Sequence, residues 1–350
     1  MPDGTRPAPV DVSAGAWAEV DPVALTRALV DIDSTTGRET EAGSWLADFL
    51  RQRSYHVVEQ PVADGRCNVY ATLDLPPQLV FSTHFDCVPP FFPSREERGL
   101  LFGRGACDAK GILAAQVAAA ERLRAAGERR VGLLFVAGEE RGSVGARIAN
   151  EQAPAGVRYL VNGEPTDNRL GAATRGVLRI RLRAHGRAAH SSFPELGESA
   201  IDKLLDALMV IRGVELPADA LLGRTHYTVG LIEGGVAPNV VSPHAAAEVL
   251  FRVVGEGAPV RAALAVVEPL VSVETILDVP AVRMHTVPGF ETAIFPYTTD
   301  VPLLPRWGTP LLVGPGSIHV AHTDEEHVSI DELRHAVDLY TGLAALLLST

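Results

Sequence analysis

The chain has few cysteines, no long hydrophobic run and no excess of basic residues. Its 350 residues include three cysteines, Cys67, Cys87 and Cys107, too few for a disulfide framework in a chain of this size. The C-terminal run LAALLL falls far short of the roughly 20 apolar residues that span a bilayer. Asp and Glu outnumber Lys and Arg by 43 to 31, so no basic stripe is available to neutralise phosphates. We therefore expect neither a membrane segment nor a nucleic-acid partner.

The remaining composition is that of an ordinary globular protein. Hydrophobic residues make up 47% and charged residues 21% of the chain, which is long enough for two packed domains. The first residues contain no basic region followed by an apolar stretch, so no secretory signal is visible. With so few cysteines, a cytoplasmic location is the expectation.

The first half of the chain alternates between strand-like and helix-like segments. Short apolar runs at 79–86, 131–140 and 159–165 are typical of buried parallel strands, and helical spacing of apolar residues marks 110–127 and 142–153. This rhythm predicts an α/β domain with a mostly parallel, mixed sheet that is covered by helices on both faces.

The pattern changes near Thr174, where strands begin to alternate apolar and polar residues. Such strands predict an antiparallel sheet with one solvated face, and hence an inserted α+β domain at 174–286. Its expected strands are 177–186, 226–235, 245–254 and 273–279, and its expected helices are 199–213 and 258–271. The first domain would comprise 1–173 and 287–350, with a last strand at 309–316 and a last helix at 330–348.

Polar residues with catalytic potential follow the expected strands, and ligands bind at the carboxyl ends of such strands. His84 and Asp86 are two residues apart, so on an extended chain both side chains point the same way. In one interpretation His84 binds a metal and Asp86 fixes its tautomer; in the other, His84 is a satisfied strand-end histidine. Asp108 follows a glycine-rich turn and precedes a helix, so it is either a ligand or an N-cap.

Three further acids end the next two expected strands. Glu139 and Glu140 are adjacent, and such a pair repels itself unless a cation or a proton is shared. One of them can bind metal while the other acts as general base on a metal-activated water. A solvated pair is the alternative, and Glu164 likewise is either a ligand or a solvated loop acid.

A histidine near the C-terminus completes a metal-binding set. His322 is the candidate, with His319 and His327 as rivals that spacing alone does not separate. Two histidines and three carboxylates suit zinc, cobalt or manganese rather than a thiolate site. One bridging carboxylate among five ligands would hold two ions about 3.5–4 Å apart.

These motifs, in this order, resemble one family of di-zinc metallohydrolases. The matching segments are HFD, GRGACDAKG, GEE, GEPT, AAHSSFPELGESAID, GGVAPNVV, GPGSI and AHTDEE, and they extend from about residue 80 to 330. The family includes acetylornithine deacetylase, succinyl-diaminopimelate desuccinylase, aminoacylase and glutamate carboxypeptidase. The resemblance implies a zinc-peptidase-like catalytic domain, with the inserted domain acting as a lid that forms a homodimer.

The resemblance also implies a role for each candidate of the first domain. His84 and Glu164 would bind one zinc ion, Glu140 and His322 the other, and Asp108 would bridge them. Glu139 would be the general base, and Asp86 would orient His84. Two Zn²⁺ ions are therefore the expected cofactors, with Co²⁺ or Mn²⁺ as substitutes.

In the lid, the resemblance points to four further residues. His190 would stabilise the oxyanion in the partner subunit's active site, and capping the following helix is its alternative. Asn239 would contact substrate, with turn formation after Pro238 as its alternative. Arg175 and Arg252 would grip the substrate carboxylate, unless they form surface salt bridges.

Two positions depart from the family pattern. Cys87 stands where relatives usually carry threonine, and we expect it to have a packing role. Leu250 stands where many relatives carry an aspartate, which leaves the details of the carboxylate grip open.

The expected substrate is a small N-acyl amino acid, with deacetylation of an acetylornithine-like substrate as the first choice. N-acetyl-lysine, N-acetyl-citrulline and N-succinyl-diaminopimelate are close competitors, and dipeptidase or carboxypeptidase activity uses the same chemistry. A metal-binding relative without catalysis is a remote alternative.

Overall fold

The computed structural model describes residues 19–349, which form two compact units. Of the described residues, the first unit comprises 19–172, Met284–Ala293 and 299–349, and the second comprises Ala173–Arg283 and Ile294–Thr298.

The first unit is built on a six-stranded mixed sheet. Its strand order is β1-β2-β6-β3-β7-β17, in which β6, β3, β7 and β17 run parallel and β1 and β2 add an antiparallel edge. The bounds are β1 His56–Ala63, β2 Arg66–Thr72, β3 Leu79–His84, β6 Val131–Val136, β7 Tyr159–Asn162 and β17 Thr309–Leu312. The expectation of a mostly parallel, mixed sheet is confirmed.

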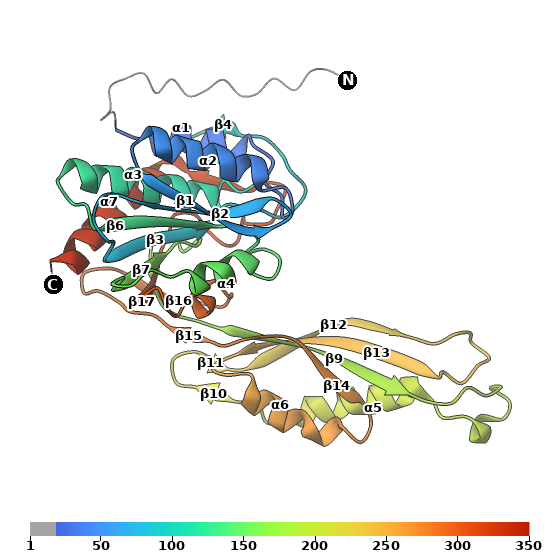
Figure 1. The fold of residues 1–350 in the computed structure, drawn as a ribbon. Helices are drawn as coiled ribbons and strands as arrows, with labels where there is room; N and C mark the ends of the chain where they lie inside the picture. Colours follow the sequence, from blue (N-terminus) through green and yellow to red (C-terminus); the bar gives the residue numbers. More distant parts are fainter. Residues whose placement is uncertain (1–18, 350) are drawn as a thin grey trace, which may run out of the picture. The chain divides into compact units, whose positions relative to one another are not determined.

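Helices cover both faces of this sheet, as Figure 1 shows. One face is covered by α1 (Pro22–Val30), α2 (Thr40–Gln52), α3 (Lys110–Ala125) and α7 (Ile330–Leu348). The other face is covered by α4 (Val144–Glu151). Every residue of β3 and β6 is buried, which is why these strands read as continuous apolar runs rather than alternating ones.

The described chain also contains two small three-stranded sheets. They have the orders β18-β5-β4 and β15-β8-β16, and a 3₁₀ turn, η3, spans Val301–Leu303. The strand bounds are β4 Arg95–Glu97, β5 Leu100–Phe102, β18 His327–Ser329, β8 Leu170–Thr174, β15 Val282–Arg283 and β16 Thr292–Phe295.

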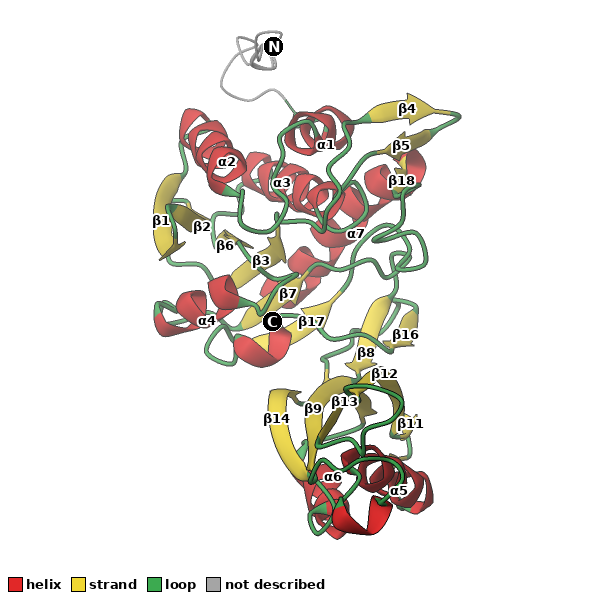
Figure 2. Ribbon diagram, turned by 90° about the vertical axis from the view of Figure 1, so that its right-hand side faces the viewer, coloured by secondary structure: helices red, strands yellow, loops and turns green. Residues whose placement is uncertain are grey.

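The second unit is a four-stranded antiparallel sheet with two helices on one face, visible in Figures 1 and 2. The order is β12-β13-β9-β14, with bounds β9 Gly176–His185, β12 His226–Gly234, β13 His244–Val253, β14 Ser272–Val279, α5 Ala200–Gly213 and α6 Ala258–Leu264. Short elements complete it: η1 Pro194–Leu196, β10 Ala218–Asp219, β11 Gly223–Arg224 and η2 Ala265–Val267. The α6 helix is shorter than expected, because a 3₁₀ turn replaces its last turn just before Pro269, which has no N–H to continue the helix.

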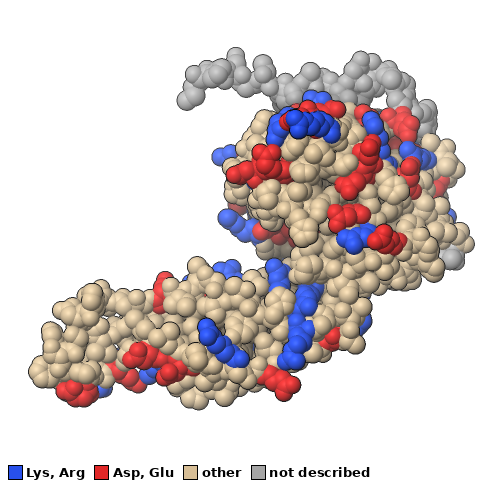
Figure 3. Space-filling view, turned by 180° about the vertical axis from the view of Figure 1, so that it is seen from behind, with Lys and Arg blue, Asp and Glu red and all other residues tan. Residues whose placement is uncertain are grey.

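The surface charge of the first unit is mixed on the face shown in Figure 3. Acidic and basic side chains lie beside one another there, and the net charge of −12 is not gathered into a single patch on this face. Among the described residues, no helix is both long and apolar enough to cross a membrane.

Candidate metal centre

Three neighbouring parallel strands bring the candidate ligands together. In the order β6-β3-β7, β3 ends at His84, β6 leads into Glu139 and Glu140, and β7 leads into Glu164. Gly163 allows this last turn to pack tightly, because a Cβ there would lie 2.3 Å from the Ile112 side chain on α3. The carboxyl ends of the strands therefore meet at one edge of the sheet.

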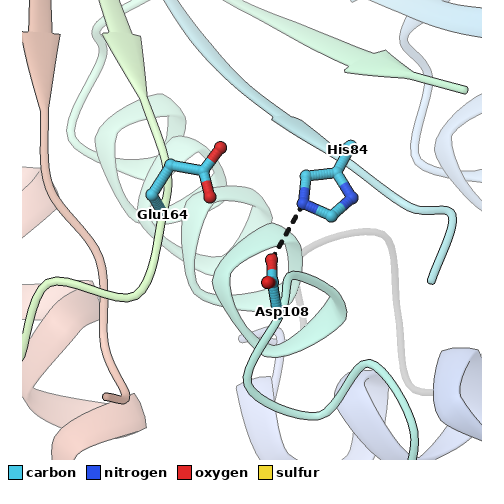
Figure 4. Close-up of side chains that lie close together, drawn as sticks. All are labelled: His84, Asp108 and Glu164. Carbon is cyan, nitrogen blue, oxygen red and sulfur yellow. Dashed lines mark hydrogen bonds and ion pairs between the residues drawn. The ribbon is translucent and has the colours of Figure 1, made fainter. Parts of the chain in front are cut away.

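The first ligand group consists of His84, Asp108 and Glu164. One potential ligand atom from each lies within 4.8 Å of the others, and all three residues are buried. The Nε2 atom of His84 is 2.9 Å from Oδ1 of Asp108. Figure 4 shows Glu164 reaching toward the same space from the end of its own strand. Glu164 is buried, which argues against a solvated loop acid at this position. Asp108 does not act as an N-cap, because α3 begins without a side-chain cap.

The second ligand group consists of Asp108, Glu140 and His322, again within 4.8 Å. The Nε2 atom of His322 is 2.9 Å from Oε1 of Glu140 and 3.3 Å from Oδ2 of Asp108. Asp108 thus presents one carboxylate oxygen to each histidine. This is the arrangement that a carboxylate needs in order to bridge two metal ions.

The structure distinguishes His322 from its two rivals. His322 has φ +65°, a left-handed conformation that residues other than glycine rarely adopt and that is concentrated at functional sites. His327 instead points Nδ1 at the main-chain oxygen of Glu325, 2.6 Å away, and its ring packs on Phe102. Within the described chain, neither His319 nor His327 joins a ligand group.

Buried negative charge is crowded at this site, and the residues fit divalent cations. Burial raises the pKa of Glu164 well above its ordinary range, and the charge of Asp108 adds to the shift. Burial also raises the pKa of Glu140. At Asp108 the penalty of burial is outweighed by hydrogen bonds to His322 and His84, which hold its pKa well below the usual range. Divalent cations would offset this concentration of acids.

Glu139 lies beside the ligand groups but belongs to neither. Burial raises its pKa well above the ordinary value, against the opposing charge of His84. Its main-chain N–H donates to Oδ1 of Asp86 at 3.0 Å, and this contact fixes the turn after β6. Because the Glu139 carboxylate belongs to neither metal-ligand group, it is available to accept and donate a proton.

The Asp86 carboxylate makes the expected contact with His84 and several others. The Nδ1 atom of His84 is 3.0 Å from the main-chain oxygen of Asp86 and 3.5 Å from its carboxylate, so the carbonyl is the closer partner. The Asp86 carboxylate also accepts hydrogen bonds from the N–H groups of Glu139 and Glu140, at 3.0 and 3.2 Å, and from the Thr36 hydroxyl at 2.9 Å. Asp86 therefore ties the Glu139–Glu140 turn to the end of β3.

Glu326 is a positioning residue that sequence reasoning missed, although it lies in the quoted AHTDEE motif. Its Oε1 accepts the main-chain N–H groups of Gly105, Cys107 and Asp108 at 3.0–3.2 Å. Its Oε2 pairs with Arg104 at 2.7 Å, and both side chains are buried. The turn that carries Asp108 is thereby held to the segment that carries His322.

Replacing Glu326 with glutamine is expected to weaken metal binding by about 10- to 100-fold, the usual effect of losing a group that orients ligands. The amide would place N–H donors against Arg104 or against the main-chain N–H groups of the Asp108 turn. Competition with a chromophoric chelator measures the affinity. The matched control is Glu325→Gln, an exposed neighbour whose side chain is 72% accessible. Equal affinity in the two variants would refute the positioning role.

Asp300 is a second acid that sequence reasoning missed. It is 2% exposed, and neither carboxylate oxygen makes a hydrogen bond of normal geometry within the described chain. Burial raises the pKa of Asp300 to about 6, while the Ser143 hydroxyl opposes the shift. Its charge in turn contributes to the raised pKa values of Glu139 and Glu164. Nothing in the sequence TTDVP distinguishes this acid from a turn residue.

In the second unit, the structure brings His190 and Asn239 together. His190 and Val240 form an isolated β-bridge, and Ser191 N–H donates to the main-chain oxygen of Asn239 at 3.0 Å. His190 is exposed, and its Nδ1 accepts the N–H of Ser192 at 3.1 Å. The alternative that His190 caps the following helix is wrong, because the Ser199 side chain caps α5.

The two expected carboxylate-binding arginines have different surroundings. Arg175 donates to the main-chain oxygens of Arg224, at 2.7 Å, and Leu222, and it lies 3.2 Å from Nδ1 of His226. Both terminal nitrogens of Arg175 therefore already have acceptors within the second unit. Arg252, which pairs with His226 in the sheet register, is half-buried, and its side chain makes no hydrogen bond or ion pair with a described residue. Of the two, Arg252 has the free guanidinium.

The two positions that depart from the family pattern are Cys87, which follows β3, and Leu250, which lies within β13. Cys87 is fully buried, with Sγ 3.9 Å from the Ser34 hydroxyl, and burial raises the pKa of its thiol. A buried, protonated thiol is a poor nucleophile, which agrees with the expected packing role. Leu250 lies in β13 and is half-buried.

Comparison with known proteins gives a consistent match over most of the chain. The sequence profile of peptidase family M20/M25/M40 matches residues 80–346. A probable carboxypeptidase of Aspergillus clavatus is 37% identical over 91% of this chain and 80% of its own length. A peptidase M20 domain-containing protein of Schizosaccharomyces pombe is 34% identical over 91% of this chain and 82% of its own length.

Solved structures share the fold at lower identity. An aminopeptidase of Bacillus cereus superposes with a TM-score of 0.78 at 20% identity, covering 94% of this chain and 98% of its own. A dinuclear metal-binding peptidase of Bacillus subtilis gives a TM-score of 0.72 at 15% identity, covering 94% and 98%. These superpositions cover most of the chain and support the expected fold.

Proposed function

Because this chain belongs to peptidase family M20/M25/M40, we propose that it hydrolyses the amide bond of an N-acyl amino acid with two divalent metal ions. In general terms, the chain is a metal-dependent hydrolase of amide or peptide bonds that acts on a small peptide or amino-acid derivative. The observation that carries the proposal is the placement of Asp108, with one oxygen toward each of the two histidines.

The ligand groups divide between two ions. His84 and Glu164 would hold one ion, Glu140 and His322 the other, and Asp108 would contact both. Zinc is the proposed metal, because two imidazoles and three carboxylates suit it, and Co²⁺ or Mn²⁺ would substitute. Bound divalent ions acidify a water molecule and polarise the scissile carbonyl.

The protein's own residues then manage the proton and the substrate. Glu139 accepts a proton from the attacking water and returns it to the leaving amine. Asp86 keeps Glu139 in place through the main chain, as its contacts indicate. His190 is proposed to donate a hydrogen bond to the developing oxyanion, in trans within a homodimer formed through the second unit.

The ends of the substrate are assigned to residues of the second unit. Arg252, with its free guanidinium, is proposed to bind the carboxylate of the leaving amino acid. Asn239 would contact the substrate beside it. Arg175 would act by supporting this region, since each of its terminal nitrogens donates to a main-chain oxygen.

An N-acetyl amino acid such as N-acetyl-ornithine is the first candidate substrate. N-acetyl-lysine, N-acetyl-citrulline and N-succinyl-diaminopimelate are alternatives of the same chemistry. A second candidate function is carboxypeptidase activity, which the names of the Aspergillus relatives favour. A cytoplasmic location and the homodimer are parts of the same proposal.

Amide hydrolysis of these four N-acyl substrates and a set of dipeptides tests the proposal. The full chain is loaded with zinc or cobalt, and a chelator-treated sample is the control. We expect chelator-sensitive cleavage of an N-acyl amino acid, with turnover restored by adding metal. Cleavage of dipeptides alone would favour the carboxypeptidase candidate. The N-acyl proposal fails if the metal-loaded protein cleaves none of the four.

A further inference from the structure

The turn that carries Glu139 and Glu140 has contacts, direct and through Asp86, with a segment far away in the sequence, residues 34–39. This segment precedes residues 80–346, the part of the chain that the family profile matches. It connects α1 to α2 within the first unit. None of its side chains belongs to a ligand group, so metal binding does not explain why it lies here.

Hydrogen bonds fix the segment to the residues that follow β3. The N–H of Cys87 donates to the main-chain oxygen of Ser34 at 3.1 Å, and the N–H of Thr36 donates to the main-chain oxygen of Cys87 at 3.0 Å. The Ser34 hydroxyl donates to the main-chain oxygen of Phe85 at 2.6 Å. The main chain therefore sets the position of Thr36 beside Asp86.

The Thr36 hydroxyl fixes the orientation of the Asp86 carboxylate. It donates to Oδ2 of Asp86 at 2.9 Å, and the same oxygen accepts the N–H of Glu140 at 3.2 Å. The other oxygen, Oδ1, accepts the N–H of Glu139 at 3.0 Å. A hydrogen bond to a carboxylate is charge-assisted and stronger than one between neutral groups. Thr36 therefore holds both oxygens where the two N–H groups of the turn need them.

A buried ion pair lies against the start of the same turn. Oε1 of Glu39 is 3.0 Å from Nη1 of Arg66, and the two side chains are 0% and 13% accessible. A Cβ on Gly138, the residue before Glu139, would lie 3.5 Å from that Nη1 atom. Oε2 of Glu39 accepts the N–H of Gly37 at 2.6 Å. The segment therefore contacts the turn a second time, through this pair.

The position of Glu39 in its own helix does not account for its burial. Glu39 is at the N-cap of α2, where a polar side chain commonly accepts a main-chain N–H of the helix, but it makes no such hydrogen bond. A buried ion pair contributes little net stability, because the cost of desolvation offsets the attraction. The fixed position that the pair gives to Gly138 explains it better than stability does.

We propose that the segment 34–39 positions the Glu139–Glu140 turn, and with it the general base, through Thr36 on Asp86 and through Glu39 and Arg66 on Gly138. The inference rests on the proposed function, in which Glu139 moves the proton. Thr36 and Glu39 neither bind metal nor carry the proton in this scheme, so both are positioning residues. Their effect on turnover is large because a displacement of about 1 Å in a reacting group can lower a rate about 100-fold.

The first test compares Thr36→Val with Thr36→Ser and Thr35→Val. Valine keeps the shape of threonine but cannot donate to Asp86, whereas serine keeps the hydroxyl. Thr35 is the matched control, because it is also half-buried but its hydroxyl donates to Asp33, at 2.8 Å. At saturating Co²⁺, Thr36→Val is expected to lower kcat about 10- to 100-fold, the usual effect of losing a group that orients a metal site, with KM little changed. Thr36→Ser and Thr35→Val should stay close to the wild type.

The second test replaces Glu39 with glutamine. The amide would place N–H donors against the N–H of Gly37 or against Arg66, so kcat should fall here too. The control is Glu41→Gln, an exposed glutamate on α2. Melting temperatures of the metal-loaded variants are measured in parallel. If Thr36→Val and Glu39→Gln lowered the melting temperature but kept wild-type kcat, their role would be structural and the proposal would be overturned.

A binding measurement separates this proposal from the proposed function. Because the Thr36 hydroxyl and the Glu140 N–H share one oxygen of Asp86, Thr36→Val should also weaken Co²⁺ binding, measured by competition with a chromophoric chelator. Thr36→Ser and Thr35→Val should not. If no substrate is cleaved but Thr36→Val alone weakens Co²⁺ binding, the proposed reaction fails and the positioning role stands. If N-acyl substrates are cleaved and Thr36→Val matches Thr35→Val in kcat and in Co²⁺ affinity, the reaction stands and the positioning role fails.

Discussion

Glu139→Gln is expected to lower kcat by about 10²- to 10⁴-fold, the contribution typical of a general base, with the metal content unchanged. Glutamine keeps the size of the side chain but cannot accept a proton. The main-chain N–H of residue 139 would still donate to Asp86, so the turn after β6 should persist. Because Glu139 belongs to neither ligand group, both ions should stay bound. Steady-state kinetics and metal analysis of the same sample measure the two effects.

The adjacent residue provides the contrasting variant. Glu140→Gln replaces a member of the second ligand group, so it should lose metal as well as activity. The two variants carry the same Glu→Gln change at adjacent positions. Comparing them should therefore separate proton transfer from metal binding. Near wild-type turnover in Glu139→Gln with metal bound would contradict the assignment of the general base, and so would loss of metal from that variant.

Asp108→Ala is expected to impair both metal sites and to reduce turnover to the level of the chelator-treated protein. Its two carboxylate oxygens face different histidines, His84 at 2.9 Å and His322 at 3.3 Å. Removing the side chain therefore takes one ligand from each group. By contrast, His84→Ala should weaken one site, and His322→Ala the other. Equilibrium dialysis against Co²⁺, followed by elemental analysis, gives the number of ions and their affinities.

The control for this series is Asp324→Asn, an exposed acid on the segment that carries His322. It changes the charge of the chain by the same amount without touching a ligand group. Its metal content should match that of the wild type. If Asp108→Ala bound two ions with wild-type affinity, the bridging role would be wrong. If it lost one ion and kept the other at full affinity, Asp108 would belong to a single site.

The parallel strands and long helices could be predicted from sequence because their patterns are local. The buried runs at β3 and β6 are continuously apolar, and α3 and α7 show helical spacing of apolar residues. The end of α6 was less predictable. The apolar pattern continues beyond Leu264, but the helix changes to a 3₁₀ turn before Pro269. A hydrophobic pattern marks the buried face of a segment more reliably than the point at which its hydrogen bonding ends.

The types of metal-binding residue could be predicted for a related reason. The residues that surround and position them could not. Strand ends in an open α/β sheet converge, so acids and histidines at those ends predict a shared site. Asp300 and Glu326 follow no such rule. Asp300 comes from a loop after β16, and Glu326 acts through main-chain N–H groups more than 200 residues away. Contacts between distant loops depend on how the chain folds back, and a single sequence carries no local signal of them.

By itself, the sequence determined which residue types could form a di-metal hydrolytic centre and the order of the strands and helices that carry them. The tertiary structure decided which histidine joins the site, because only His322 among its rivals is directed at Asp108 and Glu140. It also decided that Asp86 holds the Glu139–Glu140 turn. Local patterns record burial and backbone preference, whereas the direction of a side chain and the identity of its neighbours depend on packing between segments that are far apart in the chain.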